Sequence, residues 1–322
     1  MNTRVGESKT VEVSAAVLLR PEGTYLLAQR PADKIWAGYW EFPGGKVEPG
    51  ETPHHALVRE LHEELGIEVQ QAYPWLTRVF TYPHATVRLN FFRVTAWGGE
   101  PHPHEGQQFA WQLPGAATVA PILPANAPIL RALELPALYA ISNVAELGER
   151  KFLERLEAKL DEGLRLVQLR EKGLARESVL ALAVRMRDMM RPYGAKLLVN
   201  ADVALAQQVG ADGVQLTARQ LAELEARPEV AWCGASCHSV EELRRAEALG
   251  CDFALLSPVL QTQSHPGEPA LGWQAFAQHV AGATIPVYAL GGMSLGMMQE
   301  AWRQGAHGVA LLRQAWRSSG AP

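Results

Sequence analysis

Hydrophobic and polar positions follow two different patterns along this chain, and the pattern changes near Leu135. From Val11 to about Ala110, apolar and polar residues alternate, as in strands with one face in a core and one in solvent. One segment, from about Pro53 to Leu65, has helical periodicity instead. We therefore predict that the N-terminal part is an α+β domain, with a mixed sheet and helices.

Beyond Leu135, short apolar runs alternate with amphipathic helical segments. Continuous apolar strands separated by helices are typical of a parallel sheet that is covered on both faces. About eight such units in about 180 residues predict a compact (β/α)8 TIM barrel. An open, doubly wound sheet is the alternative, but the even spacing shows no obvious point where the strand order reverses. The predicted strands are ALYAIS, RLVQLRE, KLLVN, GVQLT, VAWCGAS, FALLSPV, PVYALGG and GVALLR.

A stretch rich in Pro and Ala, from Leu113 to Pro136, separates the two patterns. We expect it to hold the end of the first domain, a short closing helix and a link. The predicted domains are residues 1–134 and 135–322. A chain of 322 residues accommodates two domains at ~100–200 residues each.

Composition narrows the classes of partner. The net charge of -4 gives no basic field for direct nucleic-acid binding. No apolar run reaches the ~18 residues of a membrane span, and the N-terminus lacks the apolar core of a signal peptide, so we expect a cytoplasmic protein with no membrane partner. Cys233 and Cys237 could be half of a metal site, but no second pair of ligands matches them. With Cys251, they are predicted to be buried free thiols.

The segment GGKVEPGETPHHALVRELHEELGI, residues 44–67, carries the most chemistry. Thr52 is a good helix cap, and Pro53 suits the first helical turn because its missing N–H costs nothing there. Gly66 is a good helix end. The sequence therefore predicts one helix between these signals.

Three glutamates, Glu60, Glu63 and Glu64, are spaced i, i+3 and i+4, so they share one face of this helix. They repel one another unless a positive charge lies among them, and Arg59 can offset only one of the three. Hard divalent cations are the natural counter-charge for carboxylate oxygens. The preceding glycines, Gly44 and Gly45, let the backbone approach a ligand or offer a carbonyl to a metal. A solvated acidic helix face is the alternative for such a cluster taken alone.

The full spacing resembles the Nudix box at every fixed position: Gly45, five residues, Glu51, seven residues, then Arg59-Glu60-Leu61-His62-Glu63-Glu64-Leu65-Gly66-Ile67. The resemblance implies a hydrolase that splits a pyrophosphate bond with one to three Mg²⁺ ions, which Mn²⁺ can replace. The implied metal ligands are Gly44 (carbonyl), Glu60, Glu63, Glu64 and Glu105.

The same resemblance gives the remaining box residues their expected roles. The general base is Glu63, Glu64 or Glu105, and the sequence leaves the choice open. Arg59 is expected to orient a glutamate, and Glu51 to steady the loop or a ligand glutamate. We expect Glu63→Gln to remove nearly all activity without unfolding the domain.

Outside the box, the domain resembles the MutT branch of this family through EFPGGK, residues 41–46, and LPANAPIL, residues 123–130. This resemblance implies that Asn126 hydrogen-bonds a purine base, that Phe42 lies against its ring and that Arg30 contacts the base or nucleotide. Taken alone, Asn126 would be a turn residue and Arg30 a surface cation. The turn Tyr82-Pro83-His84-Ala85 departs from the pattern, because it lacks an arginine that some MutT proteins have near the base.

The C-terminal part, from Ala137 to Arg317, resembles thiamine phosphate synthase and the TenI-type thiazole tautomerase. The resemblance rests on QLREK (168–172), Asn200, GVQL (213–216), SCHS (236–239), ALGGM (289–293) and GAHGV (305–309). These motifs end strands, where barrel sites lie, and the glycine-rich turns suit a phosphate. The candidate residues of this second site are Arg170, Lys172, Asn200, His238, Gly291 and Gly292.

This part also departs from the synthase. Ala201 replaces an aspartate, the segment Thr217-Ala218-Arg219-Gln220 lacks a second acidic metal ligand, and Gln263-Ser264-His265-Pro266 replaces a lysine-containing loop. Synthase activity is therefore not expected. His238 matches a histidine of the tautomerase, where proton transfer needs no metal. A neutral structural histidine is the alternative.

Three hypotheses follow. The leading one is an 8-oxo-dGTP diphosphatase that removes oxidised purine nucleoside triphosphates from the nucleotide pool, as a form of DNA repair during replication. A second keeps the hydrolase but gives it a thiamine-related diphosphate as substrate. A third makes the barrel a non-catalytic module that binds a thiazole or thiamine phosphate. Asn126 and Phe42 favour a purine.

Overall fold

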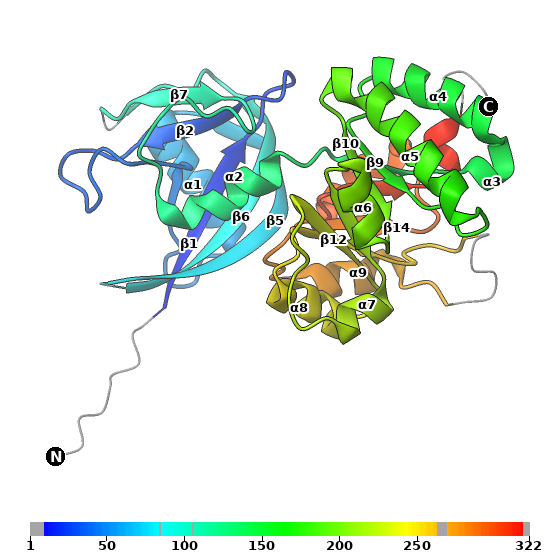
Figure 1. Cartoon of the computed structure of the whole chain (residues 1–322). Coiled ribbons are helices and arrows are strands. Elements are labelled where there is room, and N and C mark those ends of the chain that lie inside the picture. The colour runs from blue at the N-terminus through cyan, green and yellow to red at the C-terminus, as the bar shows by residue number, and fades with distance from the viewer. Residues whose placement is uncertain (1–9, 84, 105, 263–268, 318–322) are drawn as a thin grey trace. The chain divides into compact units, whose positions relative to one another are not determined.

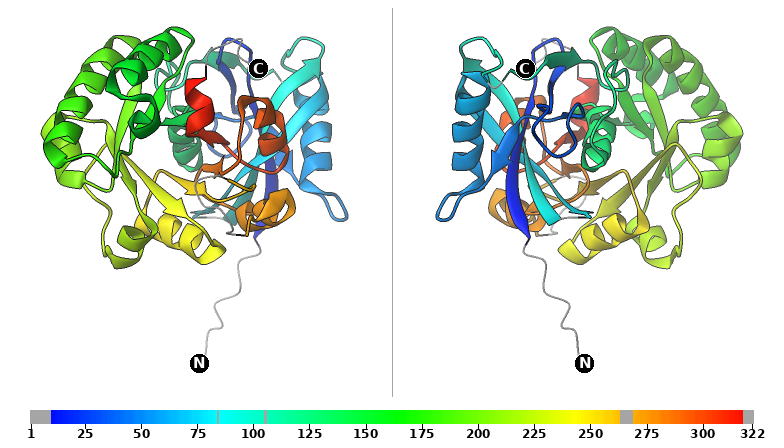
Figure 2. Two further views of the ribbon diagram at one scale, coloured as in Figure 1. Left: turned by 90° about the vertical axis from the view of Figure 1, so that its right-hand side faces the viewer. Right: turned by 90° about the vertical axis from the view of Figure 1, so that its left-hand side faces the viewer.

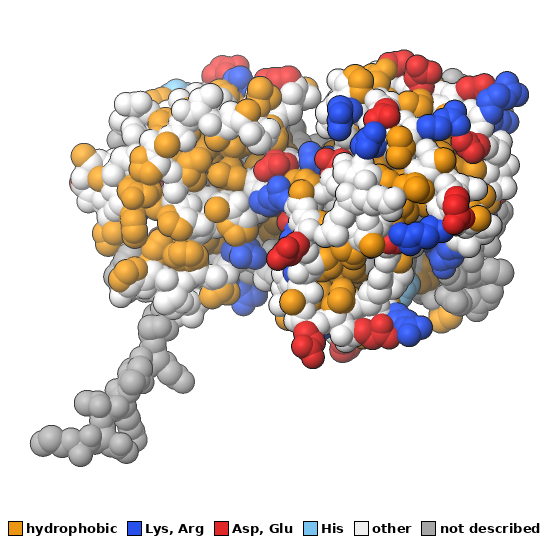
Figure 3. Space-filling view, in the orientation of Figure 1, with side chains coloured by type: hydrophobic (Ala, Val, Ile, Leu, Met, Phe, Trp, Pro, Cys, Tyr) orange, Lys and Arg blue, Asp and Glu red, His pale blue; other side chains and the backbone are white. Residues whose placement is uncertain are grey.

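The computed structural model describes residues 10–83, 85–104, 106–262 and 269–317. The chain divides into two compact units, Met1–Glu134 and Leu135–Pro322 (Figure 1). Each unit has its own clusters of buried apolar side chains. Over the described ranges, every helix is too short or too polar to cross a membrane. Acidic and basic side chains are interspersed on the face of the second unit seen in Figure 3.

The N-terminal unit holds a four-stranded sheet of order β4-β1-β6-β5 and a three-stranded sheet of order β3-β2-β7. Its strands are β1 (Val11–Leu18), β2 (Tyr25–Gln29), β3 (Trp40–Glu41), β4 (Gly44–Lys46), β5 (Glu68–Tyr82), β6 (Ala85–Gly98) and β7 (Phe109–Gln112). Its helices are α1 (Pro53–Leu65), the short 3-10 turn η1 (Pro124–Asn126) and α2 (Ala127–Leu133). β1 runs parallel to β6 but antiparallel to β4, and β5 runs antiparallel to β6. The predicted α+β fold with a mixed sheet is confirmed.

The central strand β1 differs from its prediction. The alternation predicted a strand with one face in solvent, but all residues from Ser14 to Leu18 are buried. Ala15 and Val17 pack into a cluster with residues of α2, while Ala16 and Leu18 pack into a cluster with residues of α1. The expectation of a half-buried strand is wrong here because helices cover both faces. In both views of Figure 2, α1 lies against the sheet that contains β1 and β6.

The C-terminal unit is a closed barrel of eight parallel strands, so the predicted TIM barrel is confirmed and the open sheet is wrong. Its strands are β8 (Leu138–Ile141), β9 (Leu166–Leu169), β10 (Lys196–Asn200), β11 (Gly213–Leu216), β12 (Trp232–Cys237), β13 (Phe253–Leu256), β14 (Val287–Leu290) and β15 (Gly308–Leu311). The first strand, β8, closes the barrel by pairing with both β9 and β15. Each strand is short and almost wholly buried, as a parallel sheet covered by helices requires.

Helices surround this barrel in Figure 1. The α-helices are α3 (Val144–Leu147), α4 (Glu149–Asp161), α5 (Arg176–Met190), α6 (Val203–Val209), α7 (Ala218–Glu223), α8 (Val240–Leu249), α9 (Gly272–Val280) and α10 (Met298–Arg303). The 3-10 turns are η2 (Arg191–Tyr193), η3 (Leu295–Met297) and η4 (Arg313–Trp316). Inside the barrel, the large rings of Tyr139, Phe253 and Tyr288 pack edge to face or tilted, with centroids 5.6 Å apart. Cys233, Cys237 and Cys251 are buried free thiols, as predicted.

Candidate functional site

Helix α1 has the bounds that its end signals predict. The Thr52 side chain accepts a hydrogen bond from the His55 backbone N–H at 3.2 Å, and Pro53 occupies the first turn. Gly66 ends the helix in the left-handed conformation, which costs glycine little. The buried residues of the helix are Ala56, Leu57, Leu61 and Leu65. Burial of these residues places Glu60 and Glu64 toward the loop that precedes the helix.

Two of the three glutamates approach the glycine loop. Oε2 of Glu64 accepts a hydrogen bond from the Gly44 backbone N–H at 3.1 Å. A Cβ on Gly45 would lie 2.2 Å from the Glu60 carboxyl carbon. A Cβ on Gly44, whose φ is +139°, would lie 2.1 Å from the Ser14 carbonyl oxygen. Only glycines therefore allow this loop to lie between β1 and the carboxylates of α1.

Arg59 contacts three carboxylates rather than one. Its guanidinium lies 3.0 Å from Glu51, 2.8 Å from Glu60 and 3.2 Å from Glu63, and it also donates to the Lys46 carbonyl. Its planar fork has several donors, so one guanidinium reaches all three carboxylates, of which Glu60 and Glu63 belong to the predicted cluster. One positive charge still cannot neutralise three. The hydrogen bond from Arg59 is the main reason that the pKa of Glu51 is lowered.

The donors near Gly44 suit a hard divalent cation in kind, since they are carboxylate and carbonyl oxygens. Glu60 and Glu64 line the same cleft as Gly44, whereas the side chain of Glu63 is 57% exposed. Over the described ranges, no three His, Cys, Asp or Glu side chains are gathered as a metal centre. Glu105, predicted as a further ligand, lies outside the described residues.

A cleft of about 780 Å³ extends from these carboxylates to the candidate base contacts. Besides Glu60, Glu64, Gly44 and Gly45, its walls include Arg30, Trp36, Glu41, Phe42, Tyr82, Gln107 and Asn126. The fold therefore brings all three predicted base-contact residues into one cavity with two of the predicted metal ligands. A cleft of this size is ample for a nucleotide.

Arg30 is not a free surface cation. Its Nη1 lies 2.5 Å from Oε1 of Glu41, and its Nε donates to the Ile35 carbonyl at 2.7 Å. Burial raises the pKa of Glu41, and the charge of Arg30 opposes that rise. Sequence reasoning missed Glu41, although it is the first residue of the quoted EFPGGK segment. Its apolar neighbours Trp40 and Phe42 were the available signal, since a carboxylate between buried residues needs a partner.

Asn126 and Phe42 both line the cleft, but their surroundings differ. Asn126 is only 4% exposed, and its side-chain Nδ2 has no hydrogen-bond partner within the described part of the chain. Phe42 packs in the core, and the centroid of its ring lies 5.8 Å from those of both Tyr25 and Phe91.

Trp36, which sequence reasoning also missed, contacts Tyr82 at the cleft, with ring centroids 6.1 Å apart. Its backbone φ of +65° is rare for a bulky residue.

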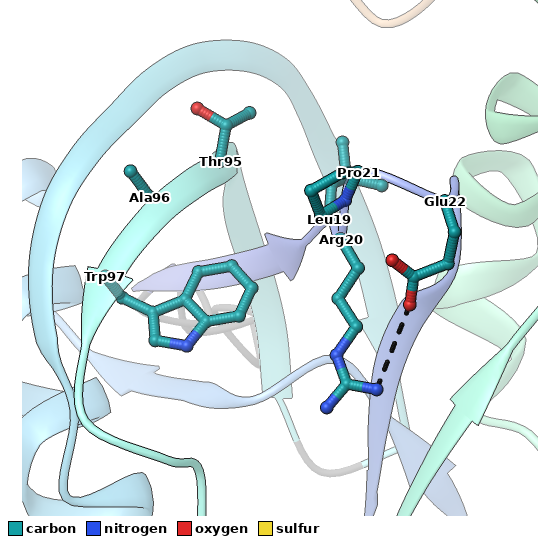
Figure 4. Close-up of a pocket in the computed structure, with 7 residues that line it drawn as sticks. All are labelled: Leu19, Arg20, Pro21, Glu22, Thr95, Ala96 and Trp97. Carbon is teal, nitrogen blue, oxygen red and sulfur yellow. Dashed lines mark ion pairs between the residues drawn. The ribbon is translucent and has the colours of Figure 1, made fainter.

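A second hollow of about 390 Å³ lies elsewhere in this unit (Figure 4). Arg20 and Trp97 line it, and Arg20 lies 3.9 Å from Glu22. The Arg20 guanidinium also lies over the Trp111 ring, 3.8 Å from its centroid. The one carboxylate that lines this hollow, Glu22, is paired with Arg20. The hollow therefore does not resemble a metal–phosphate site.

In the second unit, the predicted residues lie where strands end. Arg170 follows β9 and is half-buried, and burial lowers the pKa of its guanidinium. Lys172 is exposed and Asn200, the last residue of β10, is half-buried. Gly291 and Gly292 follow β14 with φ of +97° and +69°, and a Cβ on either would lie within 2.9 Å of the chain near Pro258 or Leu260. Two cations, Arg170 and Lys172, and a turn of two glycines thus follow strands of the barrel.

The acidic groups at this end are already engaged. Glu171 accepts hydrogen bonds from the Ser142 hydroxyl at 2.6 Å and from the Val144 backbone N–H at 2.9 Å. Asp202 caps α6 by accepting from the Leu205 N–H at 2.8 Å, and its other oxygen lies 3.0 Å from Arg176. Neither carboxylate is therefore disposed to replace a missing metal ligand.

The residues at the positions that differ from the synthase pattern have structural roles of their own. Ala201 has a φ of +63°, an uncommon conformation for alanine. Thr217 and Gln220 form a reciprocal capping box at the start of α7, and Gln220 also donates to the Ala201 carbonyl at 2.6 Å. Neutral hydrogen bonds thus occupy the place where the synthase resemblance expects an acid. Residues 263–266, which replace the lysine-containing loop, lie outside the described residues.

His238 is exposed at the end of β12. Its Nδ1 lies 2.8 Å from the Ser257 carbonyl oxygen. Since a carbonyl only accepts, Nδ1 carries the proton in this contact and the neutral ring keeps Nε2 as an acceptor. The ring is therefore held in a form suited to proton transfer, and the same contact would also hold a purely structural histidine.

Known proteins resemble each unit separately. A family model described as Thiamine monophosphate synthase matches residues 138–315, and one described as NUDIX domain matches residues 14–132. A thiamine-phosphate synthase of Thermus thermophilus is 37% identical over 164 residues, which are 50% of this chain and 79% of the relative. The CTP pyrophosphohydrolase of Escherichia coli is 43% identical over 124 residues, 38% of this chain and 91% of the relative. An 8-oxo-dGTP diphosphatase of Haemophilus influenzae is 38% identical over 127 residues, 39% of this chain and 93% of the relative.

Proposed function

The chain belongs to the thiamine monophosphate synthase family through residues 138–315 and to the Nudix hydrolases through residues 14–132, and we propose that its Nudix unit hydrolyses oxidised purine nucleoside triphosphates. The preferred substrate is 8-oxo-dGTP, and the products are 8-oxo-dGMP and pyrophosphate. The reaction would remove oxidised nucleotides before DNA replication uses them.

The buried amide of Asn126 is the observation that carries this proposal. A buried polar group without a partner costs about 1–3 kcal/mol. Asn126 lines the cleft that also holds the carboxylates of α1, and its Nδ2 is the buried atom without a partner in the described part of the chain. The edge of a purine base offers carbonyl and ring-nitrogen acceptors that would supply the partner, since an asparagine side chain can pair with such an edge. The named relatives include both a purine and a pyrimidine nucleotide hydrolase, so this contact is the point to test.

The residues of the Nudix box would hold Mg²⁺ through Glu60, Glu64 and the Gly44 carbonyl, with Glu63 as a further ligand. Such an ion offsets the charge that develops on the phosphate oxygens. Arg59 orients the Glu60 carboxylate, and the Gly44 N–H orients that of Glu64. The base that takes a proton from the attacking water would be Glu63, Glu64 or Glu105, of which Glu105 lies outside the described residues.

Steady-state hydrolysis by the full chain with Mg²⁺ tests the substrate. We expect kcat/KM for 8-oxo-dGTP to exceed that for dGTP by ~100-fold, or about 2.7 kcal/mol in transition-state binding. Asn126→Ala should lower kcat/KM for 8-oxo-dGTP by ~10–100-fold, because the base loses its partner. Asn90→Ala is the matched control, since Asn90 bonds to Glu12 and Val13 and is not part of the cleft wall. A preference for CTP or for thiamine diphosphate would contradict the proposal.

We further propose that the barrel binds a thiazole or thiamine phosphate without carrying out the metal-dependent synthase reaction. The observation behind this is the engagement of Asp202 and Glu171 in local hydrogen bonds beside the neutral Ala201 and Gln220. Calorimetry on the full chain with thiamine phosphate should show binding that does not depend on Mg²⁺. Absence of binding by any thiamine-related phosphate would contradict this proposal.

If the barrel also catalyses a reaction on such a ligand, we propose a tautomerisation in which His238 transfers the proton. It predicts that His238→Asn abolishes proton exchange on a thiazole phosphate while the ligand still binds. An unchanged exchange rate would leave the barrel as a binding module.

A further inference from the structure

Two histidines of the N-terminal unit face each other away from the cleft. Nε2 of His102 lies 2.8 Å from Nε2 of His104, and the ring centroids are 4.6 Å apart. Both residues are exposed, and neither lines the cleft described above. The contact is a hydrogen bond between the two imidazole rings, and it brings the Nε2 atoms of both rings to one place on the surface.

The tautomer of His102 is set by its surroundings. Its Nδ1 lies 2.7 Å from the Glu100 carbonyl oxygen, which can only accept, so the proton of the neutral ring is on Nδ1. The lone pair of His102 Nε2 therefore accepts the hydrogen bond, and His104 donates its Nε2–H. To bind a metal, His104 moves this proton to its Nδ1, which frees the lone pair of its Nε2. A histidine whose other ring N–H is held by a carbonyl is the usual arrangement of a metal ligand.

The backbone of this segment is fixed on the end of α1. His102 N–H donates to the Leu65 carbonyl at 3.1 Å, and His104 N–H donates to the Glu64 carbonyl at 3.2 Å. Gly66 lies directly under both rings, because a Cβ there would be 2.7 Å from His104 Nε2 and 2.9 Å from His102 Cε1. The C-terminal end of a helix carries partial negative charge, which favours a bound cation.

From this geometry we propose that His102 and His104 bind a divalent transition-metal ion of the Zn²⁺, Ni²⁺ or Cu²⁺ class. Imidazole nitrogens select these ions over Mg²⁺, which prefers oxygen. Two nitrogens about 2.0–2.1 Å from a tetrahedral Zn²⁺ lie about 3.3 Å apart, so the Nε2 atoms need to separate by about 0.5 Å while both rings turn their lone pairs toward the ion. The described ranges hold no group of three such ligands, so solvent completes an open site.

The ion would link His102 to His104, whose backbone N–H groups are bonded to the end of α1, and would stabilise the folded unit because it binds this arrangement. The site is independent of the proposed hydrolase reaction. Its metal is of a different class from the carboxylate site, and its test does not depend on nucleotide turnover.

Calorimetric titration of the full chain with Zn²⁺, in the presence of excess Mg²⁺, tests the site. We expect one equivalent of Zn²⁺ to bind, and the double variant His102→Gln/His104→Gln to lose this binding. The matched control is His54→Gln/His55→Gln, an exposed pair whose ring centroids are 6.3 Å apart with no nitrogen–nitrogen contact. This control should bind Zn²⁺ like the wild type.

The thermal unfolding temperature is the second readout. Zn²⁺ should raise it in the wild type and in the control pair but not in His102→Gln/His104→Gln. Without Zn²⁺, the three proteins should unfold at the same temperature, which shows that the variants are folded. Wild-type protein that binds no Zn²⁺, or a double variant that binds it as the wild type does, would overturn the proposal.

Discussion

The Nudix unit and the barrel both offer candidate sites for phosphates, but their charges are arranged in opposite ways. In the Nudix cleft, Glu60 and Glu64 are directed toward a glycine loop, an arrangement that calls for a cation between protein and phosphate. At the strand ends of the barrel, the proposed phosphate contacts are Arg170, Lys172 and the turn at Gly291, which would need no cation in between. The comparison teaches that family membership gives the fold, whereas the charge at the site decides which chemistry the fold can support.

Loss of a Nudix carboxylate should give the largest effect. Glu64→Gln removes the charge but keeps the shape and the contact with the Gly44 N–H, so we expect kcat to fall by ~10²–10⁴-fold, as for loss of a general base or metal ligand. Steady-state pyrophosphate release measures it. Glu68→Gln, at the exposed start of β5, should leave kcat unchanged. If Glu64→Gln kept wild-type turnover, the assignment of the cleft would fail.

In the barrel, the corresponding test removes a positive charge instead of a negative one. Arg170→Gln should weaken binding of thiamine phosphate by ~10-fold or more, because a hydrogen bond to a charged group contributes about 1.5–3 kcal/mol. Calorimetry on the full chain checks this, with nucleotide hydrolysis expected to be unchanged. Arg150→Gln, whose side chain is 91% exposed on α4, is the control. Equal affinity in the Arg170 variant would mean that the phosphate binds elsewhere.

Relief of the backbone strain at Ala201 should have a smaller effect, which concerns stability and not activity. Because alanine is strained at a φ of +63°, Ala201→Gly should raise the free energy of unfolding by about 0.5–1 kcal/mol. Ala281→Gly, at a φ of -56°, should lower it instead. Denaturant unfolding compares the two. A loss of stability in Ala201→Gly would show that the Ala201 methyl group makes contacts that outweigh the strain.

The smallest effect is a pH dependence in the Nudix unit. The hydrogen bond from Arg59 lowers the pKa of Glu51 in the folded state below its ordinary value of 4.5. Its contribution to stability is therefore fully present above the unfolded-state pKa and is lost as the pH falls through the folded-state pKa. Thermal unfolding between about pH 5 and pH 2 should show a shallower pH dependence for Glu51→Gln than for the wild type. Identical slopes would mean that this ion pair adds nothing to stability.

The sequence was sufficient for features set by local signals. Thr52, Pro53 and Gly66 predicted the bounds of α1, and eight apolar runs predicted the eight strands of the barrel. It was not sufficient where residues far apart in the chain meet. The pairing of Arg30 with Glu41 and the three contacts of Arg59 depend on how a loop folds over α1, and alternation alone could not show that helices cover both faces of β1.

The pairing of β8 with β15 also bears on how the chain is made. Residues up to Glu134 form a complete unit, so this part can fold while the ribosome is still adding the remainder. The barrel cannot close then, because Leu138–Ile141 must wait for Gly308–Leu311. At ~5–20 residues per second, this interval lasts roughly 10–35 s. During it, the open edge of β8 is exposed to other chains, and chaperones have their best opportunity to act.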